Sequence, residues 1–249
     1  MLALTHHPSS LLAHCELTHV CRQHIDVDLA IAQHQDYRKA LSEAGLDVRV
    51  YQHNLQYADS VFVEDVAVVL DELILLGSMG AKSRELETRV WRSILAEFRP
   101  VQELPAGATL EGGDVLRIGR NLVIGHSRRT NAVAIEAVSD IVRPLGYSLH
   151  TVPMSRCLHL KTACTALDDD TLLINPDWID VPTACRKRIL FAADAWGANV
   201  VRLRDRLLAN SQHQATIEQL RLSGYQVEAV DLSEFAKAEA GATCLSLLI

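Results

Sequence analysis

The sequence predicts an α/β protein in which five ββαβ-like units, each of about 50 residues, close into a ring around a central site. Apolar strand pairs split by short polar turns recur along the chain, with helical apolar spacings between them. The ring closes if the tail Cys244–Leu248 pairs with the N-terminal run Leu2–Thr5, which also removes an exposed strand edge. We therefore expect residues 1–249 to form a single domain.

The individual elements follow from the same patterns. Hairpins are expected at residues 67–70 with 73–76, 115–118 with 122–124, 164–167 with 172–174, and 200–203 with 207–208. Helices are expected at 26–44, 82–98, 128–145, 182–196 and 212–223, several of them followed by glycine. Each helix precedes a strand run, at 47–51, 101–104, 147–152, 200–203 and 225–230. Residues 200–203 thus end one unit and open the next hairpin.

Composition restricts the class of protein and its partners. With 249 residues, 49% of them hydrophobic, the chain can bury a sizeable core. A net charge of −7 without a long basic run argues against nucleic acid and suits a cationic small molecule. No apolar stretch reaches the ~20 residues of a membrane span. The start of the chain lacks signal-peptide features, and the six cysteines suit reduced thiols, so we expect a cytoplasmic protein, with a homodimer left open.

Polar residues stand at a similar distance ahead of each hairpin turn. In a radial array such equivalent positions converge near one end of the axis. A thiol, an imidazole and several carboxylates would then share one central site. These positions are Glu64 with Asp65, Glu111 with Asp114, His159 with Lys161, Asn199, and Cys244.

Three of these residues have the chemistry of a nucleophilic site. Cys244 and His159 are a thiol and a base far apart in sequence, as is common for catalytic pairs. Glu111, followed by two glycines, is suited to orient an imidazole. The residues alone leave open a buried structural cysteine, a core histidine and a polar turn before a strand.

Further charged residues suit a guanidino amino acid. Asp59, Glu64 and Asp65 surround a short apolar run, and buried carboxylates match the fixed donors of a guanidinium; the alternative is an exposed strand face. Arg84 and Arg129 each start a helix and can clamp a carboxylate, or lie in solvent. Residues 14–24 are rich in His and Cys, but their spacing does not match a structural zinc site. We expect a loop that covers a pocket instead. No metal or other cofactor is expected.

Five dispersed motifs resemble the dimethylarginine dimethylaminohydrolases of the pentein superfamily, whose fold is a five-bladed αβ propeller. The resemblance implies Cys244 as nucleophile, His159 as general acid and then base, and Glu111 as its carboxylate partner. It also implies a binding set for the substrate: Asp65 and Glu64 for the guanidinium, Asp59 with backbone carbonyls near Leu17 and Ala238 for the α-ammonium, and Arg84 with Arg129 for the α-carboxylate. The motifs are residues 59–65, 111–114, 129–131, 158–161 and 243–247.

The activity implied by this resemblance is that of a cysteine-dependent amidinohydrolase. It converts dimethylarginine or monomethylarginine to L-citrulline and an alkylamine through a covalent thiouronium. His159-Leu160-Lys161 stands where related deiminases and amidinotransferases carry His-x-Asp, which favours the dimethylaminohydrolase branch. A hydrolase of arginine, citrulline or another guanidino compound, and a non-catalytic binding protein, are the alternatives. Departures at residues 14–24, 174–194 and 240–242 leave the preferred substrate open.

Overall fold

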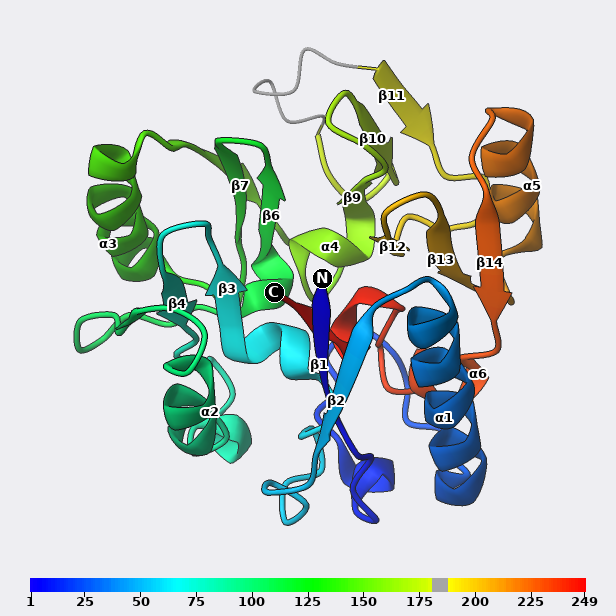
Figure 1. Cartoon of the computed structure of the whole chain (residues 1–249), viewed down its shortest axis with the longest axis horizontal. Coiled ribbons are helices and arrows are strands. Elements are labelled where there is room, and N and C mark those ends of the chain that lie inside the picture. Colours follow the sequence, from blue (N-terminus) through cyan, green and yellow to red (C-terminus); the bar gives the residue numbers. More distant parts are fainter. Residues whose placement is uncertain (181–187) are drawn as a thin grey trace.

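A computed structural model of the chain describes residues 1–180 and 188–249. Figure 1 shows five small sheets around a common centre, with the longer helices on the outside and both chain ends near the centre. Every sheet repeats one pattern, an antiparallel strand pair followed by a parallel third strand. This repetition confirms the predicted ring of five αβ units.

Each sheet has three strands, and the middle strand is hydrogen-bonded to both of the others. In this order the strands are β15 (Leu247–Leu248), β1 (Leu2–His6) and β2 (Asp47–Tyr51); β3 (Ala67–Val69), β4 (Ile74–Leu76) and β5 (Val101–Gln102); β6 (Val115–Ile118), β7 (Asn121–His126) and β8 (Ser148–Pro153); β9 (Cys164–Ala166), β10 (Thr171–Ile174) and β11 (Arg188–Phe191); and β12 (Val200–Arg202), β13 (Leu207–Asn210) and β14 (Val227–Val230).

The two ends of the chain share one sheet, as predicted. β1 pairs antiparallel with β15, with Leu4 opposite Leu247, and parallel with β2. The tail strand is shorter than the predicted run Cys244–Leu248, because Thr243–Leu245 forms a 3₁₀ turn, η6. Cys244 therefore lies on a helical turn at the start of a strand.

The longer helices pack apolar faces against the sheets. In α1 the buried positions include Ala30, Tyr37 and Leu41, and the Asp26 carboxylate caps the helix by accepting from the Leu29 amide. The predicted helices at 82–98 and 128–145 are shorter in the structure, since 3₁₀ turns occupy part of each range. The helices and turns are α1 (Val27–Glu43), α2 (Thr88–Leu95), α3 (Ala132–Val142), α4 (Leu160–Ala163), α5 (Gln214–Leu222), α6 (Ser233–Ala236), η1 (Leu12–His14), η3 (Lys82–Arg84) and η5 (Arg143–Leu145).

One predicted helix is wrong where the structure describes it. Arg188–Phe191 forms β11, parallel to β10, whereas the sequence predicted a helix over 182–196; residues 181–187 lie outside the described part of the chain. A short apolar run does not distinguish helix from strand, and pairing with β10 decides the conformation. As a consequence, Val200–Arg202 begins the fifth unit and does not also end the fourth.

Short helical turns bring the predicted polar positions together. η2 (Val63–Val66) contacts both η4 (Gly112–Asp114) and η6, and η4 contacts α4. Each turn precedes the first strand of its sheet, directly or, for η6, with Ser246 between them. Glycine permits the close approach, since a Cβ on Gly112 would lie 2.1 Å from the Glu64 carbonyl oxygen. The predicted convergence of these positions is confirmed.

Candidate active site

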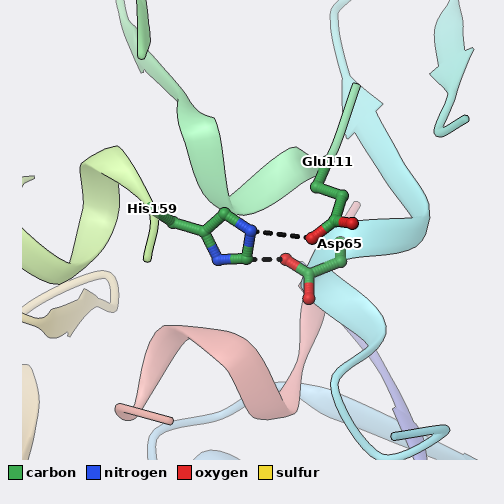
Figure 2. Close-up of side chains that lie close together, drawn as sticks. All are labelled: Asp65, Glu111 and His159. Carbon is green, nitrogen blue, oxygen red and sulfur yellow. Dashed lines mark hydrogen bonds and ion pairs between the residues drawn. The ribbon is translucent and has the colours of Figure 1, made fainter. Parts of the chain in front are cut away.

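A buried imidazole between two carboxylates lies at this convergence. Figure 2 shows His159 pointing toward Glu111 and Asp65, which come from three different units of the ring. The Nε2 atom of His159 is 2.8 Å from Oε2 of Glu111, and its Nδ1 atom is 3.8 Å from Oδ1 of Asp65. All three side chains are buried. The prediction that Glu111 lies beside His159 is confirmed as geometry.

The electrostatics of this cluster favour the charged imidazole. Burial lowers the pKa of His159, but the charges of Asp65 and Asp114 and the bond to Glu111 outweigh it and raise the pKa from 6.5 to about 9. Burial raises the pKa of Glu111, yet the hydrogen bond and charge of His159 bring it well below its usual range. His159 is therefore an imidazolium at neutral pH and holds a proton that it can donate.

Asp114 fixes the position of the imidazole. Its carboxylate accepts from the Leu160 amide at 3.0 Å and from the Ser127 hydroxyl at 2.6 Å. The first bond anchors the start of α4, directly after His159. The sequence alone does not indicate this role, because the Leu160 amide that Asp114 binds lies in a different unit of the ring.

Cys244 lies on η6, which packs against the turn that carries Glu64 and Asp65. The residue as a whole is partly exposed, and its sulfur accepts a hydrogen bond from the Gly241 amide at 3.4 Å. Burial raises the pKa of the thiol strongly, and the negative charges of Glu64 and Asp65 raise it further. The resting group is a protonated thiol facing two acids, so a bound cation at these acids would favour the thiolate.

Glu64 is held by two neighbours within the ring. Its Oε1 atom is 2.6 Å from Nζ of Lys161, and its Oε2 atom accepts from the Thr243 hydroxyl at 2.7 Å. Thr243 precedes Cys244, so Glu64 links the second unit to the turn that carries the thiol. The alternative that Asp59, Glu64 and Asp65 form an exposed strand face is wrong, because all three are buried.

The two arginines are also buried, which excludes the alternative of solvated side chains. Arg84 donates to Asp65 at 2.7 Å and to both oxygens of Glu87, a buried acid that the sequence analysis did not single out. Arg129 donates through Nη1 to Glu111 at 3.2 and 3.3 Å. Within the described part of the chain Arg129 donates to Glu111 through Nη1 alone, whereas Arg84 is paired with both Asp65 and Glu87.

The loop before α1 reaches the same region. The Glu16 amide donates to both oxygens of Asp59 at 3.2 Å, and the Thr18 amide donates to Glu239. Leu17 therefore lies between two amides that are held by carboxylates, those of Glu16 and Thr18. Glu239, which holds the Thr18 amide, directly follows Ala238 in the chain. These contacts place the loop against Asp59 and Glu239, and its position over a substrate pocket stays a prediction.

Asp65, Glu111 and His159 each place one potential metal-binding atom within 4.8 Å of the others. Two carboxylates and an imidazole at this spacing are also typical of a cation site. Arg84 and Arg129 already place positive charge on the two carboxylates. A metal ion there would compete with both guanidiniums and with the imidazolium. The cluster is better explained as an ion-pair network.

Comparison with known proteins defines the class first. A family model for arginine deiminase matches residues 9–194, so the chain belongs to the arginine deiminase family. The five sequence motifs resemble the same superfamily, and the five-unit ring agrees with its fold.

Relatives then narrow the group to the dimethylarginine dimethylaminohydrolases. One from Streptomyces coelicolor is 38% identical over 98% of this chain and 95% of its own length. Another, from Pseudomonas aeruginosa, is 30% identical over 89% of each chain. A solved structure of the Pseudomonas aeruginosa enzyme, a cysteine-to-serine mutant complexed with citrulline, superposes with a TM-score of 0.92 at 28% identity, covering 98% of this chain and 97% of that one. The predicted family is confirmed.

No helix in the described residues combines the length and apolar character needed to cross a membrane.

Proposed function

We propose that the chain hydrolyses dimethyl- or monomethyl-L-arginine to L-citrulline and an alkylamine, with Cys244 as the nucleophile. The observation that carries the proposal is the buried His159–Glu111–Asp65 network beside the acid-lined thiol of Cys244. The family relationship supports the same activity, since the similar proteins from Streptomyces coelicolor and Pseudomonas aeruginosa bear that name. Residues 1–249 act as one catalytic domain with this site at its centre.

Substrate binding uses charge already present in the site. Asp65, with Glu64 beside it, holds the guanidinium of the substrate and presents its central carbon to the thiol. Arg84 occupies Asp65 in the structure, so the substrate exchanges one guanidinium for another there. Arg84, once released, joins Arg129 on the α-carboxylate, a planar anion that suits paired guanidiniums.

The α-ammonium group binds at the opposite end of the substrate. Asp59 supplies the negative charge, and backbone carbonyls of Leu17 and Ala238 supply further acceptors. Asp59 already accepts from the Glu16 amide, so the same carboxylate can contact the loop and the ligand. A substrate without its α-amino group would leave the buried Asp59 carboxylate without a cationic partner.

In the first half-reaction the Cys244 thiolate attacks the guanidinium carbon. The bound cation offsets the charges of Glu64 and Asp65 and so lowers the thiol pKa toward the working pH, and the thiol releases its proton to solvent. The bond from carbon to the substituted nitrogen breaks, and the imidazolium of His159 donates its proton to the departing amine. The product of this step is a thiouronium on Cys244.

In the second half-reaction His159, now neutral, takes a proton from water. The resulting hydroxide attacks the thiouronium carbon, the carbon–sulfur bond breaks, and the thiolate of Cys244 is released. The hydroxyl proton of the addition product passes to solvent, which leaves L-citrulline. Glu111 stabilises the imidazolium at both stages through the 2.8 Å contact with Nε2.

Cys15, Cys21, Cys157 and Cys244 are free thiols, which suits a reducing compartment such as the cytoplasm.

Product analysis tests this function. The purified chain is incubated with dimethylarginine, monomethylarginine, arginine and citrulline, and citrulline, alkylamine and ammonia are measured. We expect citrulline with a stoichiometric alkylamine from the methylated substrates, abolished by Cys244→Ser. Ammonia from arginine alone would replace the proposal with an arginine hydrolase, and no turnover of any compound would favour a binding protein.

A further inference from the structure

We propose that Glu239 is a positioning residue that holds the entrance segment Glu16–His19 over the active site and thereby sets the affinity for the substrate. This inference rests on the proposed function for its effect on substrate, but its structural part stands without it. Glu239 does not touch the substrate; it acts through the backbone on either side of Leu17.

The entrance segment and the residues that follow it as far as Ile25 have no backbone hydrogen bonding of their own in the described part of the chain. Among the described residues, no backbone-to-backbone hydrogen bond involves positions 16–25, between η1 and the first turn of α1. Side chains hold this stretch instead: carboxylates from distant parts of the chain accept from its amides, and Arg22 and Lys237 donate to backbone carbonyls in or near it. Asp59 accepts from the Glu16 amide, and Glu234 accepts from the Asp26 amide at the far end. A loop held in this way depends on each anchor.

Glu239 makes the central anchor. One oxygen of its buried carboxylate accepts from the Thr18 amide, and the other accepts from the His19 amide at 2.6 Å. Hydrogen bonds from an amide to a carboxylate are about twice as strong as those between neutral groups. Together with Asp59 on the Glu16 amide, Glu239 fixes the chain on both sides of Leu17.

The backbone at Glu239 indicates that this geometry is imposed. Its φ is +58°, and among the described residues it is the one non-glycine with a positive φ. The left-handed conformation is strained for a residue with a Cβ atom. The two carboxylate bonds offset that strain, because a side chain is needed at this position to reach the entrance segment.

Space beside the segment makes the anchor consequential. A cavity of about 340 Å³ is lined by Val20 and Gln23 of the loop and by Asn199, Asn210 and Glu239 from the ring. The loop is therefore not backed by close packing on this side. Without the Glu239 carboxylate, the entrance segment and Val20 after it have room to move toward this cavity, which would displace Leu17.

The consequence for the substrate follows from the neighbours of Glu239. Ala238 directly precedes Glu239 in the chain. Leu17 lies between Glu16, which Asp59 holds, and Thr18, which Glu239 holds. The carbonyls of Ala238 and Leu17 are the proposed acceptors for the α-ammonium. Displacing the segment removes contacts made equally by bound substrate and transition state. Such a loss raises KM and leaves kcat nearly unchanged.

The experiment compares Glu239→Gly, Glu239→Gln and the control Glu218→Gln in the full chain. Glycine removes the carboxylate and accepts the positive φ without strain, so this variant separates anchoring from folding. Glutamine keeps one acceptor oxygen. Glu218 is an exposed acid on α5, so its replacement tests loss of charge alone. Amide hydrogen exchange at Thr18 and His19, the thermal midpoint, and KM with kcat for dimethylarginine are measured.

We expect exchange at Thr18 and His19 to accelerate about tenfold or more in Glu239→Gly and less in Glu239→Gln, with the thermal midpoint unchanged or higher in the glycine variant. KM rises about tenfold in Glu239→Gly with kcat within about twofold, and Glu218→Gln matches the wild type. Unchanged exchange at both amides overturns the anchor. Faster exchange with unchanged KM overturns its role in substrate affinity. If Glu239→Gly fails to fold, Glu239→Gln decides both points.

An inactive wild type would refute the proposed function and leave the exchange measurement as an independent test of the anchor.

Discussion

Replacing Glu111 with glutamine removes the carboxylate that contacts His159 while keeping its shape. The glutamine carbonyl still accepts from the Gly80 amide, as Glu111 does at 3.0 Å. What is lost is a negative charge 2.8 Å from Nε2 of His159. The perturbation therefore acts on the electrostatics of the imidazole rather than on its packing.

The size of the effect follows from the pKa of His159. Asp65, Asp114 and Glu111 together raise it from 6.5 to about 9 against the effect of burial. At about 1.4 kcal/mol per pH unit, this corresponds to roughly 3 kcal/mol in favour of the imidazolium. A carboxylate within hydrogen-bonding distance shifts a pKa by about 1–3 units. We expect Glu111→Gln to lower the pKa of His159 by about one unit or more, since Asp65 and Asp114 remain.

Two assays report this change. Nuclear magnetic resonance of ring-labelled histidine gives the pKa of His159 directly. The pH dependence of kcat gives the group that must be protonated to release the amine, and its alkaline limb should move to lower pH in Glu111→Gln. Coincident titrations of His159 in the wild type and in Glu111→Gln would refute the reasoning. The control is Glu136→Gln, an exposed acid on α3, which should leave both profiles unchanged.

Stability should depend on pH in the same sense. The pKa of His159 in the folded chain lies above its value of 6.5 in the unfolded chain, so the ion pair stabilises fully below pH 6.5. That contribution is lost as pH rises through about 9. Urea titrations at a series of pH values should show the decline in the wild type and a smaller one in Glu111→Gln.

Three further predictions concern packing and the thiol. Gly112→Ala should destabilise the fold by about 1–3 kcal/mol or more, because its Cβ would meet the Glu64 carbonyl oxygen at 2.1 Å; chemical denaturation checks this, and an unchanged midpoint would contradict it. Cys244 should react faster with a cationic halo-amidine than with a neutral halo-amide of equal intrinsic reactivity, since Glu64 and Asp65 attract the cation; equal labelling rates, measured by mass spectrometry, would argue against acids at the thiol. Removing residues 1–5 should abolish both activity and cooperative unfolding, because β1 forms the centre of the sheet that carries the tail; an active truncated chain would show that the sheet is dispensable.

Much of the fold was predictable because local signals and the ring repeat agree. Polar turns between apolar runs predict the hairpins, and the pairing of Leu4 with Leu247 follows from the need to close the ring. The strand Arg188–Phe191 was not predictable, since its few apolar residues fit a helix equally well and its conformation depends on β10.

The site divides in the same way. The convergence of Cys244, His159 and Glu111 was predictable, because they occupy equivalent positions in the repeat, whereas their catalytic roles rest on the family resemblance and stay a prediction. Glu87 and Glu239 were missed, since an acid that binds a distant backbone amide or arginine resembles any surface acid in the sequence. Their partners became visible only with the tertiary contacts.

The covalent step at Cys244 is the most direct test of the proposed chemistry. The wild type and Cys244→Ser are mixed with dimethylarginine, quenched in acid at short times, and analysed by intact-protein mass spectrometry and peptide mapping. We predict a transient adduct on Cys244, equal to the substrate less dimethylamine, which decays as citrulline appears and is absent from Cys244→Ser. Citrulline formation by Cys244→Ser at the wild-type rate, or turnover with no adduct on Cys244 at any time, would contradict nucleophilic catalysis by this residue.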